Sequence, residues 1–530
     1  MLLVQSFGDR PSGDIQVKAI EKLNLLNIAE DGRFSGPVIT AIVENQDDAR
    51  IASTFLTDNL GNSTGGDIII KTKSLNLING GQISTRTFLA GQAGDIIIDA
   101  SNELNVLDFS PEFPIFFSNI SSATFSSGAS GEVSISTDQL LVTNGGVIGS
   151  ATFGPGSGGS VNILATDIRL AGILPFFLFP SSINAATFGP GDAGELTINA
   201  NTLSLFDSSR IGTSTVGTGN AGTVNIDTSE SIFISGSNPI SPNPSLIDSS
   251  ASITGPTFED QLGALPVPLG NAGGLNISTK NLSVVDGALI SVNNDGLGNA
   301  GNINLEADFL KLSSRGEISA STESGNGGNI RLQSELLSLD DSIISASAKG
   351  LGLGGNVAIN SSLIVGIGES RISANAEQSV GGRIRIDTLS VFGENLTITA
   401  TSDLGSQFDG QVEIDVEDRP VLVDQVEIQQ PRTNTVKLAC SPDSSSGQSS
   451  FSMQSSGGLA AQPRNFSQTL PIASKKAAEP QLSFSAPFIV DKESGKKVFL
   501  VEPSGFHRQS DGTRCLGYIG TENNAKAVTL

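Results

Sequence analysis

The chain has 530 residues, a formal net charge of −24 and only 16% charged residues, with 61 glycines and no tryptophan. Such an acidic chain lacks the cationic face that nucleic acids require, so we expect no nucleic-acid partner. No run reaches the ~18 apolar residues of a membrane-spanning helix, so we expect no membrane-spanning segment. The start, "MLLVQSFGDRPSG", lacks the basic and long apolar regions of a signal peptide.

A repeated unit of the form G-x-I-x-I … L-x-L … I-S organises most of the chain. A glycine precedes the first strand of every unit, and eight of the twelve intervals between these glycines are 27 or 28 residues long. A fixed period of this size is typical of solenoid proteins, in which neighbouring units bury one another. The glycines are Gly13, Gly66, Gly94, Gly131, Gly159, Gly194, Gly222, Gly273, Gly301, Gly328, Gly355, Gly382 and Gly410.

Each unit predicts three short strands joined by polar turns. In the unit that begins at Gly66, the strands are "DIIIKT", "SLNLIN" and "QISTRTF", with apolar residues at alternate positions. We therefore predict an all-β fold, a right-handed parallel β-helix (solenoid) of about 13 rungs over residues 13–417, after a lead-in of residues 1–12. One inward column is expected to hold Ile68, Ile96, Val133, Val161, Leu196 and Val224.

Equivalent residues of successive units are expected to stack in rows. The asparagines shortly before the unit glycines predict turns that tolerate positive φ, together with side-chain ladders; they are Asn220, Asn271, Asn299 and Asn326. Five residues after the third-strand isoleucine, rungs two to seven carry Phe88, Phe125, Phe153, Phe188, Val216 and Phe258. From rung eight onward the same place holds Asp295, Glu323, Lys349, Glu377 and Asp403. We expect a phenylalanine stack followed by a solvated half.

Two apolar runs interrupt this polar pattern, "LDFSPEFPIFFSN" (107–119) and "LAGILPFFLFPSS" (170–182). The long units are rungs one, three, five and seven, with third-strand isoleucines at Ile51, Ile120, Ile183 and Ile253. On this assignment all the main insertions fall between the second and third strands, so their loops emerge on one side. Either the runs cover the outer sheet face, or an exposed part of them binds a partner. The candidate partner-binding residues are Phe113, Ile115, Phe116, Phe117, Phe176, Phe177, Leu178 and Phe179.

The repeat ends near residue 418. Residues 418–480 are rich in Ser, Gly and Gln and predict a flexible segment, and residues 481–530 predict a small β-rich cap or docking segment. The two cysteines, Cys440 and Cys515, are a possible disulfide if the protein is exported, and two unpaired thiols otherwise.

Catalytic signals are weak. The single histidine, His507, lies in the tail, and the adjacent Asp340 and Asp341 would point to opposite faces of a strand. No serine-nucleophile elbow and no calcium-binding repeat is visible. We expect no enzymatic activity, no cofactor and no metal. A β-helix enzyme acting on polysaccharides, a lyase or a hydrolase, remains the alternative.

The units "GGDIIIKTKSLNLINGGQISTRTFLAGQAGDI" and "GNAGNINLEADFLKLSSRGEISASTESGNGGNI" resemble the repeats of filamentous-haemagglutinin-like two-partner-secretion exoproteins of the cyanobacterial type. Cys440, the Ser450-Phe451 pair, the glycine-rich turn at Gly457 and Pro463 resemble the C-terminal motif of that family. The resemblance implies a structural rod for adhesion. It also implies an extracellular or cell-surface location associated with the outer membrane.

By the same resemblance, the partners would be an outer-membrane two-partner-secretion transporter and a carbohydrate or protein on another surface. The family's N-terminal secretion domain carries Asn-Pro-Asn motifs, which this chain does not match; "SPNPS" (241–245) lies inside an insertion. The chain therefore resembles the C-terminal repeat portion of such an exoprotein, and a truncated, non-exported fragment is a further alternative.

Overall fold

The computed structural model divides the chain into two units, Met1–Pro420 and Val421–Leu530. In the first unit it describes residues 2–6, 15–18, 22–26, 54–59, 64–111, 113, 116–175, 177–241, 243–253, 265–393 and 395–416. In the second unit it describes three antiparallel strand pairs. These are β30 (Val436–Lys437) with β31 (Ser450–Phe451), β32 (Phe488–Val490) with β33 (Lys497–Phe499), and β34 (Phe506–Arg508) with β35 (Arg514–Leu516).

Two parallel sheets form the first unit, and each turn of the chain adds one strand to each sheet. The sheet of short strands contains β1 (Leu2–Ser6), β4 (Thr54–Asn59), β6 (Gln82–Thr87), β8 (Asn119–Thr124), β10 (Val147–Thr152), β14 (Ser182–Thr187), β16 (Arg210–Thr215), β18 (Leu246–Ala251), β20 (Leu289–Ser291), β22 (Glu317–Ser319), β24 (Ile343–Ser345), β26 (Arg371–Ser373) and β28 (Thr397–Thr399). The predicted lead-in thus contributes a strand, because β1 pairs with β4.

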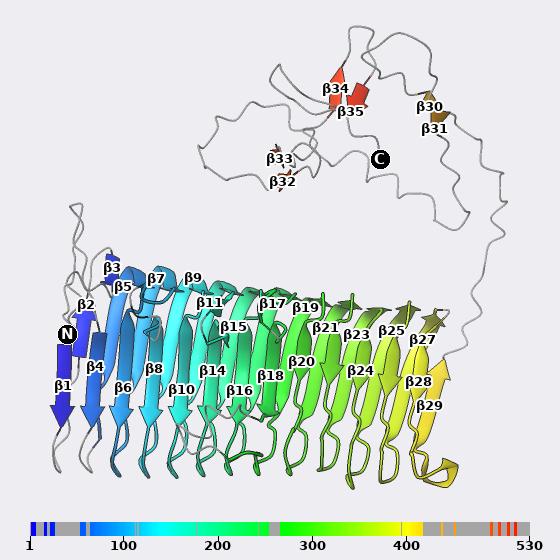
Figure 1. Ribbon diagram of the computed structural model, residues 1–530, viewed down its shortest axis with the longest axis horizontal. Helices are drawn as coiled ribbons and strands as arrows, with labels where there is room; N and C mark the ends of the chain where they lie inside the picture. The colour runs from blue at the N-terminus through cyan, green and yellow to red at the C-terminus, as the bar shows by residue number, and fades with distance from the viewer. Residues whose placement is uncertain are drawn as a thin grey trace. The chain divides into compact units, whose positions relative to one another are not determined.

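The sheet of long strands contains β2 (Ile15–Lys18), β3 (Lys22–Leu26), β5 (Ile68–Ile78), β7 (Ile96–Leu107), β9 (Val133–Thr143), β11 (Val161–Ala171), β15 (Leu196–Phe206), β17 (Val224–Ser235), β19 (Leu275–Val285), β21 (Asn302–Ser313), β23 (Asn329–Asp340), β25 (Asn356–Ile367), β27 (Arg383–Phe392) and β29 (Gln411–Val416). A short 3-10 helix, η1 (Ser406–Phe408), precedes β29. Figure 1 shows the short strands running downward in front while the rungs advance to the right, so the coil is a right-handed parallel β-helix, as predicted.

The three strands predicted for each rung are two strands in the structure. The first two merge into one long strand that bends, as β9 illustrates: Val133, Ile135 and Thr137 are buried, two exposed residues follow, and Leu140 and Val142 are buried again. The inward alternation therefore shifts by one residue at the bend. The pairing of neighbouring long strands is irregular at the same place, as between β7 and β9 or between β17 and β19. The turn-forming residues of the sequence did not reveal this, because the chain passes through the bend as one continuous strand.

The predicted inward column is confirmed. The strand registers align its six members in successive rungs, and each is fully buried. Burial of one such side chain stabilises the fold by ~1.5–3 kcal/mol, so a column that extends through the coil explains how units too small to fold alone are stable together. The column is Ile68, Ile96, Val133, Val161, Leu196 and Val224.

The third-strand assignments in rungs one and seven were wrong. In rung seven Ile247, not Ile253, is the register partner of Ile211, and Ile253 is 52% exposed. In rung one Phe55, not Ile51, is the partner of Ile83. The insertion of rung seven is consequently split: residues 236–245 precede β18, and a second insertion follows β18. The main insertions therefore do not all fall at one corner.

The phenylalanine stack is confirmed for rungs two to five. Ring centroids of Phe88, Phe125, Phe153 and Phe188 lie 5.0, 4.8 and 4.7 Å apart, with interplanar angles below 10°. Val216 is buried at the equivalent place in rung six. In rung seven this place is Ser252, because the strand assignment moves, and Phe258 lies outside the described residues. The row of charged residues from rung eight onward is aligned by backbone bonds, such as that from the Glu323 N–H to the Asn294 carbonyl.

The asparagines near the unit glycines form a ladder but do not have positive φ. The side-chain oxygen of Asn220 accepts the N–H of Asn271, that of Asn271 accepts the N–H of Asn299, and the series continues to Asn326. Positive φ occurs instead at the turn between the long and short strands, for example at Asn144 (51°) and Gly145 (88°). The ladder satisfies polar groups at an exposed corner, and the sharp turn uses the residues that best tolerate left-handed backbone.

Candidate functional site

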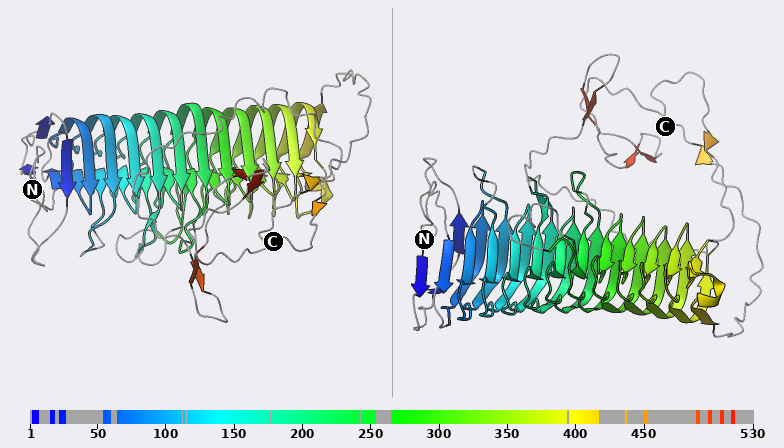
Figure 2. Two further views of the ribbon diagram at one scale, coloured as in Figure 1. Left: turned by 90° about the horizontal axis from the view of Figure 1, so that it is seen from above. Right: turned by 60° about the horizontal axis from the view of Figure 1, so that its bottom comes forward.

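Three insertions form short hairpins at the corner between a long strand and the following short strand. We call them loop 3 (residues 108–118), loop 5 (residues 172–181) and loop 7 (residues 236–245), after their rungs. Each opens on a residue with positive φ, and each is closed by a backbone bond from its last residue to its first. The closing bonds run from Ser118 to Asp108, from Ser181 to Gly172, and from Ser245 to Gly236. Figure 2 shows hairpins projecting from the same side of the coil.

The closing serine fixes each loop to the plain rung before it. The Ser118, Ser181 and Ser245 side chains are buried. Ser118 Oγ accepts the N–H of Gly80, and Ser181 Oγ accepts that of Gly145. Each of the three hydroxyls also donates to a carbonyl at the end of its own long strand, at 2.7–2.8 Å. This repeated contact gives the three loops a common direction.

Loop 5 also packs against the preceding rung through its apolar residues. β12 (Ile173–Leu174) pairs with β13 (Phe179–Pro180), and Leu174 is 1% exposed. A Cβ atom on Gly145 would lie 2.7 Å from Leu174 Cβ, so the absent side chain makes room for the loop. Loop 5 is therefore anchored by its buried apolar residues Ile173 and Leu174, and no sequence pattern indicated the contact of Leu174 with Gly145.

The candidate partner-binding residues divide into covered and exposed members. Three of them are half-buried, namely Phe116, Phe117 and Phe179. Three are exposed, namely Phe113, Phe177 and Leu178. The Phe113 and Phe116 rings meet edge to face at 6.5 Å, and the Phe177 and Phe179 rings stack at 5.7 Å. In each loop an exposed ring thus lies against a half-buried one, Phe113 against Phe116 in loop 3 and Phe177 against Phe179 in loop 5. Ile115 and Phe176 lie outside the described residues.

A groove of about 420 Å³ lies beside loops 5 and 7, over the outer face of β16, β18 and β20. Loop 5 contributes Leu178 and Pro180, and loop 7 contributes Ser241, Asn243 and Pro244. The short strands and the residues that follow them supply Arg210, Leu246, Asp248, Ser250, Ser252, Ile253, Leu289, Ser291, Asn293 and Asp295. We call this site the loop groove. Sequence reasoning missed it, because it depends on which short strands become neighbours.

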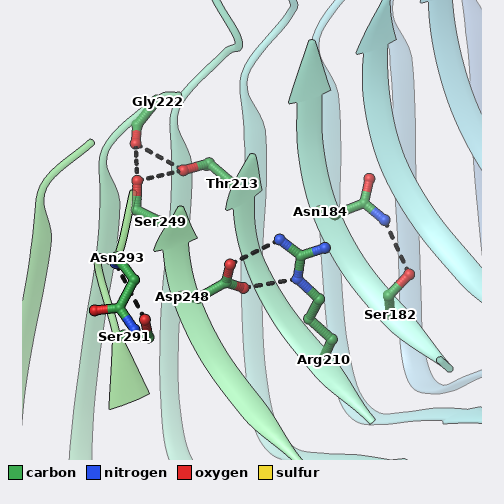
Figure 3. Close-up of polar contacts among 9 residues, drawn as sticks. All are labelled: Ser182, Asn184, Arg210, Thr213, Gly222, Asp248, Ser249, Ser291 and Asn293. Atoms are coloured by element: carbon green, nitrogen blue, oxygen red, sulfur yellow. Dashed lines mark hydrogen bonds and ion pairs between the residues drawn. The ribbon is translucent and has the colours of Figure 1, made fainter. Parts of the chain in front are cut away.

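A charged pair forms part of the lining of the loop groove (Figure 3). Arg210 Nε and Nη2 donate to the two carboxylate oxygens of Asp248, each at 2.7 Å. Asp248 is 1% exposed, and a Cβ on Gly212 would lie 2.4 Å from its Oδ1, so the glycine lets the carboxylate lean toward Arg210. Burial by itself lowers the pKa of Arg210, but the charge and hydrogen bonds of Asp248 raise it overall.

Asp295 is the second carboxylate of the loop groove. Desolvation raises its pKa, a backbone hydrogen bond from Ile253 opposes the shift, and the nearby Glu323 adds to it, although the residue as a whole is exposed. Among the described residues no salt bridge to Asp295 is found, whereas Lys349 pairs with Glu323 at 2.5 Å. Asp295 is therefore a carboxylate at the groove that can still accept hydrogen bonds.

The arrangement gives binding more support than catalysis. Glycoside hydrolysis needs two carboxylates that can act as acid and as base or nucleophile. Both oxygens of Asp248 are engaged by Arg210, which leaves Asp295 as the one available carboxylate in the described lining. In the part of the chain that the structure describes, no cluster of three metal-ligating side chains is present.

A hollow of about 470 Å³ on the outer face of the long strands contains asparagine amides that bond one another. Asn276 Nδ2 donates to Asn225 Oδ1 at 2.8 Å, and Asn304 Nδ2 donates to Asn276 Oδ1 at 2.9 Å. These groups bond one another along the coil, so the loop groove is the better candidate site.

Comparison with known proteins found no matching family model, no matching curated protein and no matching solved structure. No helix among the described residues is long and apolar enough to cross a membrane. The possible disulfide lies outside what the structure describes: Cys515 is placed only as a residue of β35, opposite His507, and Cys440 is not described.

Proposed function

We propose that this protein is a non-enzymatic, secreted or cell-surface exoprotein whose β-helix is a structural rod for adhesion or cell-surface interaction. The observation that carries the proposal is the common direction of loops 3 and 5, which hold Phe113 and Phe177 exposed beside the half-buried rings of Phe116 and Phe179. Exposed aromatic side chains are frequent at the centres of binding surfaces, because they bury a large area with little loss of conformational freedom.

The sequence resemblance supports the rest of the proposal. Filamentous-haemagglutinin-like repeats imply export through a two-partner-secretion transporter of the outer membrane and contact with carbohydrate or protein on another surface. Rods suit this task, because a coil stabilised between nearest neighbours can extend without a larger core.

Two measurements test the proposal. Antibodies against the coil, applied to intact cells of the source organism, should label the cell surface. Labelling only after the cells are lysed would show that the protein is not exported. Attachment of the labelled protein to cells should fall when Phe113 and Phe177 are changed to Ser. The matched control is Phe309→Ser with Leu351→Ser, two exposed apolar residues of the C-terminal half. Equal attachment by both double variants would contradict the proposed surface.

A polysaccharide-active enzyme is the second candidate, favoured by one observation: Arg210, Asp248 and Asp295 line one groove on one strand face. Release of new reducing ends or unsaturated products from a polysaccharide panel would establish it, provided that Asp295→Asn abolishes the release. We expect no release, because Asp248 is held by Arg210.

A further inference from the structure

The loop groove has the size of a small-ligand site and not of a protein interface. Its volume of about 420 Å³ is within the ~300–1,000 Å³ of typical small-molecule pockets. A stable protein partner needs roughly 800 Å² of surface on each side, which a groove over three short strands does not offer. The ligand that fits is a small molecule or a few units of a polymer.

The lining combines apolar patches with small polar groups. Leu178, Leu246 and Leu289 supply apolar surface, and serine and asparagine side chains lie between them. A sugar ring needs this combination, because its C–H face packs on apolar groups while its hydroxyl edge forms hydrogen bonds.

Several polar groups in the loop groove remain available for a ligand. Arg210 Nη1, Asn293 Nδ2 and the hydroxyls of Ser250 and Ser252 have no hydrogen-bond partner within the described residues, and the Asp295 carboxylate can accept. Arg210 and Asn293 are held in place by their other contacts, to Asp248 and to the N–H of Ser321. Donors whose positions are fixed lose little entropy when a ligand binds.

Two residues of the described lining have a left-handed backbone, Ser208 with a φ of 68° and Leu178 with a φ of 57°. This conformation costs a non-glycine residue ~1–2 kcal/mol, and of the two residues Leu178 carries the large apolar side chain. The turn at Leu178 is held by a backbone bond, which the Leu178 N–H donates to the Leu174 carbonyl at 2.8 Å, and the Leu178 side chain is exposed at the groove. Strain that is retained at an exposed side chain is typical of functional positions.

The charges of the groove favour an uncharged ligand. Asp248 balances Arg210, and Lys349 balances Glu323 in the rungs that follow, so Asp295 leaves one excess negative charge in the lining. Uronate or sulfate groups would be repelled at this site. The hydroxyls and amides outnumber the single free carboxylate, which a cationic ligand would need as its main partner.

We propose that the loop groove binds a neutral oligosaccharide, with Leu178 packing against a sugar ring and Asn293 and Asp295 bonding its hydroxyls. This inference rests on the proposed function as a surface-binding rod and names the class of one ligand.

Calorimetry with the whole protein and a panel of glycans tests the inference. The panel contains neutral oligosaccharides of glucose, galactose, mannose and N-acetylhexosamines, together with sulfated and uronate-containing glycans. Neutral glycans should bind. Asp295→Ala should weaken binding about tenfold or more, since a hydrogen bond to a charged group contributes ~1.5–3 kcal/mol. Leu178→Gly should weaken binding by a similar factor, because it removes the apolar surface on which the sugar ring packs. Glycine tolerates the left-handed backbone at position 178, so Leu178→Gly should remain folded.

Asp403→Ala is the matched control, because Asp403 occupies the same column outside the groove lining. No neutral glycan bound, binding only to charged glycans, or equal weakening by Asp403→Ala would each overturn the inference. Failure of the two proposals is distinguishable. If the Phe113/Phe177 variant attaches to cells as well as its control while neutral glycans still bind, the proposed adhesive surface is wrong and the proposed glycan site is supported. If that variant loses attachment but no glycan binds the parent protein, only the proposed glycan site is wrong.

Discussion

Gly145 and Leu174 lie in contact across two rungs, and the missing side chain of the glycine is what allows loop 5 to rest on the coil. The turn that contains Gly145 also donates its N–H to Ser181, the closing residue of the same loop. One glycine thus serves two needs, a left-handed backbone with a φ of 88° and a close approach.

Gly145→Ala should destabilise the protein more than Gly287→Ala. Both glycines have positive φ, 88° and 78°, so both substitutions incur the ~1–2 kcal/mol of a left-handed alanine. At Gly287 nothing lies within 4 Å of the new Cβ, whereas at Gly145 it meets Leu174. We expect a further ~1–3 kcal/mol at Gly145, the usual cost of overpacking. Chemical unfolding followed by circular dichroism measures both; equal losses would show that the contact does not matter.

The Arg210–Asp248 pair should be strongly coupled. Asp248 is nearly inaccessible to solvent, so Arg210→Met leaves a buried charge without its partner, and we expect a loss of ~3 kcal/mol. Asp248→Asn should cost a similar amount. The double variant should recover part of the loss, because both charges are then absent. A double-mutant cycle in thermal unfolding gives the coupling energy, and strictly additive losses would contradict the pairing.

Phe153 should contribute more than an isolated exposed phenylalanine. Its ring stacks on Phe125 at 4.8 Å and on Phe188 at 4.7 Å, and each aromatic pair contributes ~0.5–1.5 kcal/mol beyond burial. Phe153→Leu should therefore destabilise the coil by ~1–3 kcal/mol. Phe309→Leu, at an exposed position of a long strand, serves as the comparison and should change stability little. Thermal melting temperatures that fall equally in both variants would rule out a role for the stack.

Asp295 should make the protein less stable as the pH rises. Desolvation raises the pKa of Asp295 in the folded protein above the ordinary 3.8, so the folded state holds the proton of this carboxyl more tightly than the unfolded state does. The resulting contribution to stability is fully present below pH 3.8 and is lost as the pH rises through the folded-state pKa. Asp295→Asn should match the parent in acid and exceed it at neutral pH. Glu317→Gln should follow the same direction, because burial raises the pKa of Glu317. Unfolding measured across this pH range decides; a difference independent of pH would contradict the assigned cause.

Much of the coil could be predicted because its signals are local and repeated. Alternating apolar residues after each unit glycine placed the inward column, and equal spacing predicted the alignment of Phe88, Phe125, Phe153 and Phe188. Rung seven was misassigned because both "LIDSSAS" and "ASITGPT" offer an isoleucine followed by small polar residues. The buried Asp248 made the correct segment look less like a strand, since its partner Arg210 is 38 residues away.

The sequence by itself determined the all-β solenoid, its period and the stacking of equivalent residues, because a repeat that cannot form a core alone must bury its apolar face on its neighbours. Only the tertiary structure decided the loop groove. Leu178, Arg210, Asp248 and Asp295 come from four different rungs, and their meeting depends on the lengths of the loops that set the register of β16, β18 and β20. Such lengths leave no periodic trace, so a site built across rungs becomes visible only when the strands are paired.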